Sequence, residues 1–420
     1  MLIITAPGQG AQTPGFLSPW LELPGVAERL GAASELAGCD LIRAGTTAGA
    51  DEITDTAVAQ PLLVAAALAA AAELSAAAGL SAAAGLSAAA GLSAAAGLAD
   101  AAGLAGGPPQ SPAGAGAGAA AGHSVGELAA GVIAGVLSAD DAMRLVRARG
   151  AAMAEAAAAE PSGMTAVLGG EADAVLAAIS RCGLTAANVN GAGQVVAAGA
   201  VSGLEALAAD PPPGARLRPL QVAGAFHTRY MAPAVAALRD AAAGIECADP
   251  AITLLSNADG TAVTTGKEWL ERIVAQVAAP VRWDLCMRTM SDLGVTALIE
   301  LPPAGTLAGL ARRALPGVAV LALKSPDQLD AAREMLSEHD GEPTVGHLPD
   351  WRLVVAPTSG RFRPAAGTAG QVGVIVTRGG ERPVTAPWPS EIIEWLAEDG
   401  DPVSEGQPLV RVQPVARGQA

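Results

Sequence analysis

The sequence is poor in lysine, in aromatic residues and in cysteine, and the first shortage bears directly on function. Lysine occurs only as Lys267 and Lys324, so arginine supplies nearly all of the positive charge. With a net charge of -16, the chain has no basic run to hold nucleic-acid phosphates, which need clustered lysine or arginine. The composition therefore argues against nucleic-acid binding.

The cysteines and the N-terminal residues indicate the cellular compartment of the protein. Cys39, Cys182, Cys247 and Cys286 lie far apart with no C-x-x-C spacing, which favours reduced thiols over disulfides or a metal site. Residues 1–12 lack the basic start and long apolar run of a signal peptide. An alanine-rich stretch further on is broken by regularly spaced glycines and makes a poor membrane span. We expect a cytoplasmic protein that does not enter the membrane.

Low-complexity segments divide the chain. From Leu74 to Gly97 the hexapeptide LSAAAG occurs four times, and because six does not match the roughly 3.6 residues of a helical turn, its leucines line no single face. We expect a surface insertion over 74–118, entered by the end of a helix. A polar segment rich in proline and glycine predicts a linker at 339–350. The expected domains are therefore 1–338 and 351–416.

The order of patterns predicts an α/β fold for residues 1–338. A short buried strand opens the chain, and helical and strand patterns alternate after the insertion. Within this domain, residues 162–222 follow a βαββαβ order, which is typical of a ferredoxin-like split unit. Beyond residue 351 the pattern changes to short strands and turns, which predicts a small all-β barrel-sandwich domain.

A G-x-S-x-G pattern directly follows the insertion, with Gly122, Ser124 and Gly126 in its fixed positions. It is typical of a nucleophile elbow, a strained strand-to-helix turn in which glycines avoid clashes and the serine hydroxyl is exposed. Backbone N–H groups from Val125 onward would face an oxyanion. The alternative is an ordinary helix entry in which Ser124 caps the helix.

A serine nucleophile needs a base, and only four histidines exist. His339 and His347 lie in the expected linker. His123 directly precedes the serine, so its side chain should leave the strand on the opposite face. His227 remains as the candidate base.

Nine motifs occur in the order found in one enzyme family. They are PGQGAQ, TAVAQPLL, GHSVGE, RARGAAM, NVNGAGQVVAAG, GAFHTRYMAPA, LLSNADG, IVAQVAAPVRWDLCM and LIELPPAGTLAGL. Together they resemble malonyl-CoA:acyl carrier protein transacylase over about residues 1–335, apart from the insertion. The resemblance implies an α/β-hydrolase-like core carrying the ferredoxin-like subdomain.

The resemblance also implies roles in acyl transfer. Ser124 would carry the malonyl group as an ester, with His227 as general base and then acid. The backbone N–H groups of Gln9 and Val125 would form the oxyanion hole. The side-chain carbonyl of Gln276 would orient the His227 ring. Gln9 and Gln276 could instead be amides that only cap loops.

Two further residues concern the acyl group. Arg149 would pair with the free malonyl carboxylate, which a planar guanidinium can hold through two hydrogen bonds. Its alternative is a solvated arginine near a helix end. Phe226 resembles the residue of the malonyl-selecting version of this motif.

The implied reaction is ping-pong transfer from malonyl-CoA to the phosphopantetheine thiol of acyl carrier protein, for fatty acid or polyketide synthesis. Coenzyme A thioester is then substrate, and no covalently bound cofactor is expected. Because the carrier is acidic and this chain is too, docking needs a local basic patch. The candidates are Arg216, Arg218, Arg229, Arg282, Arg288, Arg312 and Arg313.

Residues 351–415 resemble the two halves of a biotinyl/lipoyl carrier domain. That family attaches its cofactor to a lysine at the hairpin tip between the halves. Here the tip, residues 377–382, reads TRGGER, and the whole segment lacks lysine. Amide linkage to biotin or lipoate is therefore excluded, and we expect a structural or docking role.

Two other functions remain open on the sequence alone. A serine hydrolase or thioesterase could use the same elbow, and it predicts an acid that orients the base and an apolar acyl pocket. A scaffold protein with a weakened catalytic domain is the non-enzymatic alternative, because the insertion lies directly before the nucleophile strand.

Overall fold

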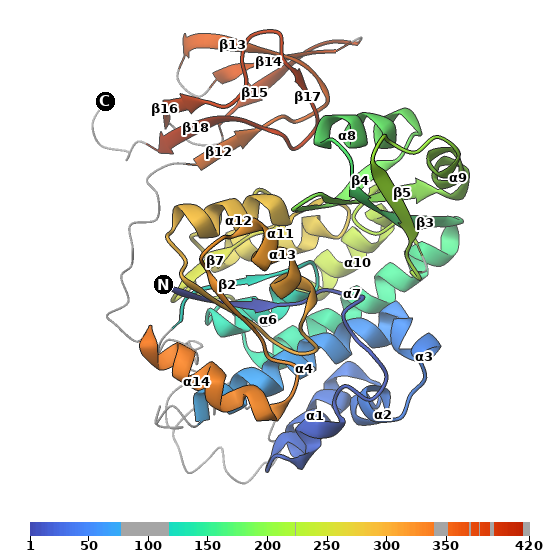
Figure 1. Cartoon of the computed structure of the whole chain (residues 1–420), viewed down its shortest axis with the longest axis vertical. Coiled ribbons are helices and arrows are strands. Elements are labelled where there is room, and N and C mark those ends of the chain that lie inside the picture. The colour runs from blue at the N-terminus through green and yellow to red at the C-terminus, as the bar shows by residue number, and fades with distance from the viewer. Residues whose placement is uncertain are drawn as a thin grey trace. The chain divides into compact units, whose positions relative to one another are not determined.

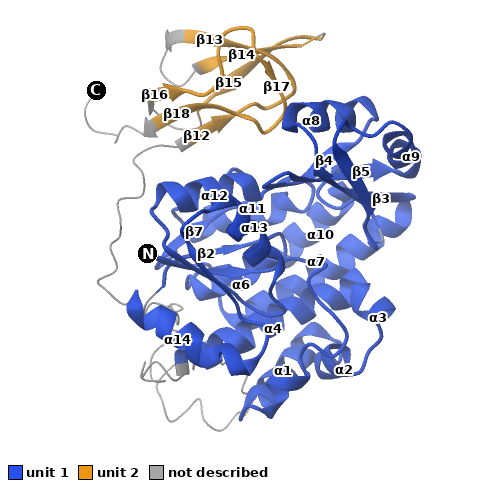
Figure 2. Cartoon of the chain, in the orientation of Figure 1, with its two compact units in different colours: residues 1–344 blue, residues 345–420 orange. Residues whose placement is uncertain are grey.

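A computed structural model describes residues 1–76, 117–222, 224–339, 352–368, 371–377, 379–386 and 390–414. The chain divides into two compact units, Met1–Thr344 and Val345–Ala420 (Figure 2). This division falls within the expected linker, of which residues 340–350 lie outside the described residues. Most of the expected insertion, residues 77–116, lies outside them too.

The larger unit is built on a six-stranded sheet of order β11-β10-β1-β2-β7-β8 (Figure 1). All neighbouring pairs are parallel except β7 and β8. Its strands are β1 (Leu2–Ala6), β2 (Ala117–Gly122), β7 (Thr253–Leu255), β8 (Ala262–Val263), β10 (Ala297–Glu300) and β11 (Ala319–Ala322). The side chains of β1 and β10 are buried throughout, as is usual for a parallel sheet covered on both faces.

Helices surround this sheet, some of them packed on other helices. The helices of the unit outside its smaller sheet are η1 (Ser18–Glu22), α1 (Val26–Ala37), α2 (Leu41–Thr46), α3 (Ala50–Thr54), α4 (Thr56–Ala76), α6 (Gly126–Ile133), α7 (Ala139–Ala159), η2 (Arg229–Met231), α10 (Ala232–Ala242), α11 (Gly266–Gln276), α12 (Trp283–Asp292), α13 (Thr306–Ala314), η3 (Pro326–Gln328) and α14 (Leu329–Glu338). Helix α6 packs against β1 and β2, and α13 against β10 and β11. By length and composition α4 could cross a membrane, but most of it is buried against α6 and α7.

A smaller five-stranded sheet of order β6-β3-β5-β4-β9 belongs to the same unit. Its elements are β3 (Ser162–Gly169), α8 (Ala172–Arg181), β4 (Thr185–Gly191), β5 (Gln194–Ala200), α9 (Val201–Ala209), β6 (Ala215–Pro219) and β9 (Val281–Arg282). One face packs on α8 and α9 through Val167 and Ala197. The other face, with Met164 and Val196, joins the main core.

The C-terminal unit has two antiparallel sheets, ordered β12-β18-β16 and β15-β14-β13-β17. They enclose a separate core that includes Phe362, Ile375 and Val410. The strands are β12 (Arg352–Val355), β13 (Gly360–Thr368), β14 (Gln371–Thr377), β15 (Gly380–Thr385), β16 (Ser390–Trp395), β17 (Pro402–Val403) and β18 (Pro408–Pro414).

The bounds predicted for the insertion were too wide at both ends. Leu74 and Ser75 are buried in the last turn of α4, and Ala117 and Gly118 open β2. The sequence of β2, AGAAAG, is poor in strand-forming residues. It forms a strand because β1 and β7 hydrogen-bond to it on both sides.

Candidate active site

The G-x-S-x-G residues form a sharp turn between β2 and α6. Ser124 has a φ of 54°, a left-handed conformation that L-residues rarely adopt. A Cβ on Gly122 would lie 2.0 Å from the backbone carbon of Gly126. A Cβ on Gly126 would lie 2.2 Å from the backbone oxygen of Ala6. Only glycine fits at both positions, so the turn has the steric character predicted for an elbow.

His227 reaches this turn from a point 103 residues further along the chain. Its Nε2 lies 2.8 Å from the Ser124 Oγ. His227 also has a left-handed backbone, with a φ of 61°, and its side chain is buried. The predicted meeting of these two side chains is confirmed.

The other ring nitrogen contacts Gln276 through different atoms than predicted. His227 Nδ1 lies 3.1 Å from both the backbone oxygen and the side-chain nitrogen of Gln276, whose side-chain oxygen accepts a hydrogen bond from Arg149 instead. Gln276 is the last residue of α11, where carbonyls lack α-helical partners. Its oxygen also accepts the Ala279 N–H at 3.1 Å, and a carbonyl oxygen has a second lone pair for the ring. With Nδ1–H donating to this carbonyl, Nε2 is left to accept the Ser124 hydroxyl proton. Assigned in this way, the ring has the tautomer of a general base.

Arg149 is buried beside the serine, although it could have been a solvated helix residue. Its Nη2 donates to Ser124 Oγ at 3.1 Å and to Gln276 Oε1 at 3.2 Å, and its Nη1 donates to Gln60 Oε1 at 2.7 Å. All three acceptors are neutral. Among the described residues, no carboxylate forms an ion pair with this guanidinium.

Close helix packing brings Arg149 to this place. The next residue, Gly150, faces the start of α4, where a Cβ would lie 2.9 Å from the backbone oxygen of Thr56. Helix α7 therefore lies close to α4, and Arg149 meets Gln60 from that helix.

Burial sets the electrostatics of the pair. It lowers the pKa of His227 to about 3, and the nearby Arg149 charge acts in the same direction. Burial also lowers the pKa of Arg149, to about 10. At neutral pH the imidazole is uncharged and the guanidinium is charged, so the site combines a free base with a cation.

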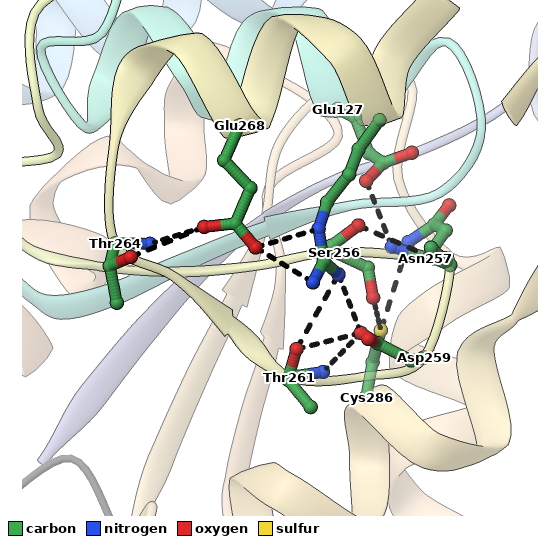
Figure 3. A network of polar contacts seen from close by, with 10 residues as sticks. Glu127, Ser256, Asn257, Asp259, Thr261, Thr264, Glu268 and Cys286 are labelled. Atoms are coloured by element: carbon green, nitrogen blue, oxygen red, sulfur yellow. Dashed lines mark hydrogen bonds and ion pairs between the residues drawn. The ribbon is translucent and has the colours of Figure 1, made fainter. Parts of the chain in front are cut away.

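Three residues of the site were not singled out from the sequence. Gln60 holds the Arg149 guanidinium. Asn257 accepts a hydrogen bond from the Ser124 backbone N–H at 2.7 Å and donates to the Gly122 oxygen at 2.7 Å. Glu127 accepts from the Asn257 backbone N–H at 2.9 Å (Figure 3). Each of the three lies in one of the motifs TAVAQPLL, LLSNADG and GHSVGE. Their place in these motifs was the only sign in the sequence that they belong to the site.

The other residues named from the sequence lie as follows. His123 points away from the serine hydroxyl to Asn190, with 2.9 Å between Nε2 and Oδ1. The Gln9 side-chain nitrogen donates to the Thr54 oxygen at 3.1 Å. Phe226 is buried directly before His227, and Val125 precedes the first residue of α6. No group of three metal-binding side chains occurs within the described part of the chain.

Comparisons with known proteins match this arrangement. The acyl transferase domain family matches residues 111–336. Malonyl CoA-acyl carrier protein transacylase of Mycobacterium tuberculosis is 50% identical over 330 residues, which cover 79% of this chain and 98% of the relative. The enzyme of the same name from Mycolicibacterium smegmatis is 49% identical over 324 residues, covering 76% of this chain and 100% of the relative.

The chain belongs to the malonyl CoA-acyl carrier protein transacylase family.

Solved structures of this family have the same α/β fold. The crystal structure of MCAT from Mycobacterium tuberculosis has a TM-score of 0.67 at 50% identity, covering 80% of this chain and 99% of that chain. A malonyl-transacylase complex with a type II PKS acyl-carrier protein has a TM-score of 0.65 at 27% identity, covering 79% and 99%. The family match ends at residue 336, before the C-terminal unit begins.

Proposed function

We propose that the chain transfers a malonyl group from malonyl-CoA to the phosphopantetheine thiol of acyl carrier protein through an ester on Ser124. The observation that carries this proposal is the buried Arg149 guanidinium in contact with Ser124 Oγ. A buried cation without a carboxylate partner is costly unless a ligand supplies the opposite charge. An acyl group with a free carboxylate supplies it at the reacting oxygen.

The chemistry needs a base, an acid and a place for the developing oxyanion. His227 Nε2 takes the proton of Ser124 as Oγ attacks the thioester carbon, and it returns the proton to the coenzyme A thiolate as the C–S bond breaks. The carrier thiol then attacks the ester in the reverse sense. We assign the oxyanion hole to the backbone N–H groups of Gln9 and Val125, which donate to no protein acceptor among the described residues.

The hydrolase alternative fits the site less well. A hydrolytic triad orients its histidine with a carboxylate. Here the partner of Nδ1 is the backbone carbonyl of Gln276, and the side chain beside it is an amide. The charged Arg149 beside the serine also disfavours an apolar acyl group.

Labelled malonyl-CoA tests the proposal. Incubated without carrier, the protein should retain label on Ser124 through gel filtration, and added holo-carrier should discharge it onto the carrier thiol. Ser124→Ala should retain none. Release of free malonate at the same rate with and without carrier would support the hydrolase, and absence of label would support a non-enzymatic scaffold.

We further propose that Arg216 and Arg218 form the basic patch for the acidic carrier. Both are exposed on β6, on the face opposite Leu217, which packs toward α8 and α9. They share their face with the residues that join the main core, and the chain leads from β6 directly to His227. Three of the other candidates have features that favour them less: Arg282 is paired with Asp284, Arg229 stacks on Tyr230, and Arg312 donates to the Val320 oxygen. Arg288 and Arg313 are exposed on α12 and α13 rather than on this sheet.

The finer fold names are proposals as well. The order β6-β3-β5-β4 supports the ferredoxin-like assignment, and the parallel sheet with an elbow after β2 supports the hydrolase-like core. For the C-terminal unit, its two antiparallel sheets support a biotinyl/lipoyl-like barrel-sandwich. Because the unit has no lysine, its role would be docking or structure rather than carrying biotin or lipoate.

A further inference from the structure

The loop between β7 and β8 holds the nucleophile elbow through one fully buried side chain, Asn257. Its amide oxygen accepts from the Ser124 N–H and its amide nitrogen donates to the Gly122 oxygen, both at 2.7 Å. These bonds fix Ser124, which has the left-handed backbone, and Gly122, which lies two positions before it. A strained conformation persists only where the surroundings determine it, and Asn257 contributes to that.

Asn257 is in turn held by Glu127, a buried acid that the proposed reaction does not use. Glu127 Oε1 accepts the Asn257 backbone N–H at 2.9 Å (Figure 3). Its Oε2 is buried and has no hydrogen-bond partner among the described residues. An anion is poorly stabilised there, and burial raises the pKa of Glu127 to about 8.

Four titratable groups on other elements face Glu127. The charges of Arg149 on α7 and Arg272 on α11 favour its ionised form, whereas Asp259 disfavours it. Cys286 on α12 is also close, and its thiol has a pKa well above the ordinary value because it is buried. None of these groups forms an ion pair with Glu127 within the described residues.

We propose that Glu127 is a positioning residue which, through Asn257, holds Ser124 in its reactive conformation. This inference rests on the proposed role of Ser124 as the nucleophile. Ionised, Glu127 would place an anion near Arg149 and compete with the malonyl carboxylate for the guanidinium. The acylation step should therefore slow as Glu127 loses its proton.

The first half-reaction isolates this effect, since no carrier thiol titrates in it. Release of coenzyme A in a single turnover with malonyl-CoA is measured from pH 6.5 to 9.5. For the natural sequence we expect the rate to fall roughly tenfold over the alkaline half of this range. Glu127→Gln, which mimics the neutral acid, should match it at pH 7 and stay flat to pH 9.5.

Two further variants separate positioning from general structure. Glu127→Ala leaves the Asn257 N–H unpaired and should lower the acylation rate about tenfold at pH 7, with no alkaline fall because alanine does not titrate. The half-saturating malonyl-CoA concentration should stay within about twofold of the natural value. Glu300→Gln is the matched control, because Glu300 is also buried but accepts from Gly305, Leu307 and Ala308 rather than from the elbow. The acylation rate of Glu300→Gln should therefore still fall at alkaline pH, as it does for the natural sequence.

The inference is overturned if Glu127→Gln keeps the alkaline fall, if it is as slow as Glu127→Ala at pH 7, or if Glu300→Gln loses the fall equally. Should Glu127→Ala not fold, the profile of Glu127→Gln still decides. A natural sequence that forms no malonyl ester at any pH would instead refute the proposed function.

Discussion

Ser124 and His227 meet with 2.8 Å between Oγ and Nε2, and both have a left-handed backbone. Two strained residues that face each other are typical of functional sites, where the surroundings determine the strain. Asn257 fixes the serine side. The Gln276 carbonyl fixes the histidine side. The distance between Ser124 Oγ and His227 Nε2 is thus set by two elements, the β7–β8 loop and the end of α11.

The contact between Arg149 and Ser124 predicts acyl selectivity. Arg149→Ala should lower the rate of malonyl transfer roughly 100-fold, because the carboxylate loses a buried charge-assisted partner. Transfer from acetyl-CoA should change much less, since acetyl has no carboxylate. Arg149→Lys keeps the positive charge but not the planar guanidinium, so its rate of malonyl transfer should lie between those of the natural sequence and Arg149→Ala. Rates with both thioesters check this, and equal losses for both would remove the carboxylate role.

The close packing around Gly126 predicts that a larger residue there lowers the free energy of unfolding. Gly126→Ala places a methyl group 2.2 Å from the Ala6 oxygen and should destabilise the fold by about 3 kcal/mol or more. Gly31→Ala in α1 is the matched control, because no atom lies within 4 Å of the position that its methyl group would take. It should be neutral or stabilising by up to about 1 kcal/mol. Denaturant unfolding compares the two, and equal stability would contradict the packing described for the elbow.

The lowered pKa of His227 predicts how stability depends on pH. The folded value of about 3 lies below the ordinary value of 6.5, so between these limits the unfolded chain binds more protons. Stability from this group is complete above pH 6.5 and declines as pH falls toward 3. From pH 7 to 5 the loss should reach about 2 kcal/mol, at roughly 1.4 kcal/mol per pH unit.

His227→Asn is the comparison for this effect, because asparagine tolerates a left-handed backbone better than most residues. Its unfolding free energy should fall less between pH 7 and 5 than that of the natural sequence. Parallel losses in the two proteins would assign the pH dependence to other groups.

The sequence predicted the meeting of Ser124 and His227 and named Gln276 as the residue beside the imidazole, but it predicted neither the Gln276 backbone carbonyl as a partner nor Asn257. The elbow follows from glycine spacing, and His227 follows from the scarcity of histidine. The role of the Gln276 carbonyl was not predictable in this way, because every residue carries a backbone carbonyl and only the helix end makes this one available. Asn257 lies 133 residues from Ser124, so no local pattern connects them.

Strand β2 shows a similar limit for the fold. Its alanines and glycines carry almost no strand preference, yet β1 and β7 pair with it on both sides. The bounds of the insertion were wrong for the same reason, because composition at residues 74, 75 and 117 does not reveal that neighbouring elements bury them.

Because the C-terminal unit has no lysine, we predict that it carries no biotinyl or lipoyl group and that its measured mass shows none. Purified after expression with biotin and lipoate ligases and both cofactors, the full chain should have its sequence mass without a biotinyl or lipoyl adduct. Val376→Lys, at the end of β14 next to the hairpin, provides a lysine near the family's attachment position. An adduct on the natural sequence would overturn the expectation.

The patch of Arg216 and Arg218 predicts a salt-dependent encounter with the carrier. Reversing both charges, Arg216→Glu with Arg218→Glu, should raise the KM for acidic holo-carrier about tenfold at low salt and reduce its dependence on salt, because charges on the rim of an interface act mainly on association. Acylation by malonyl-CoA alone should not change. Arg313→Glu is the matched control, since Arg313 is also exposed but lies on α13. Equal effects of both changes would mean that net charge, rather than this edge strand, governs docking.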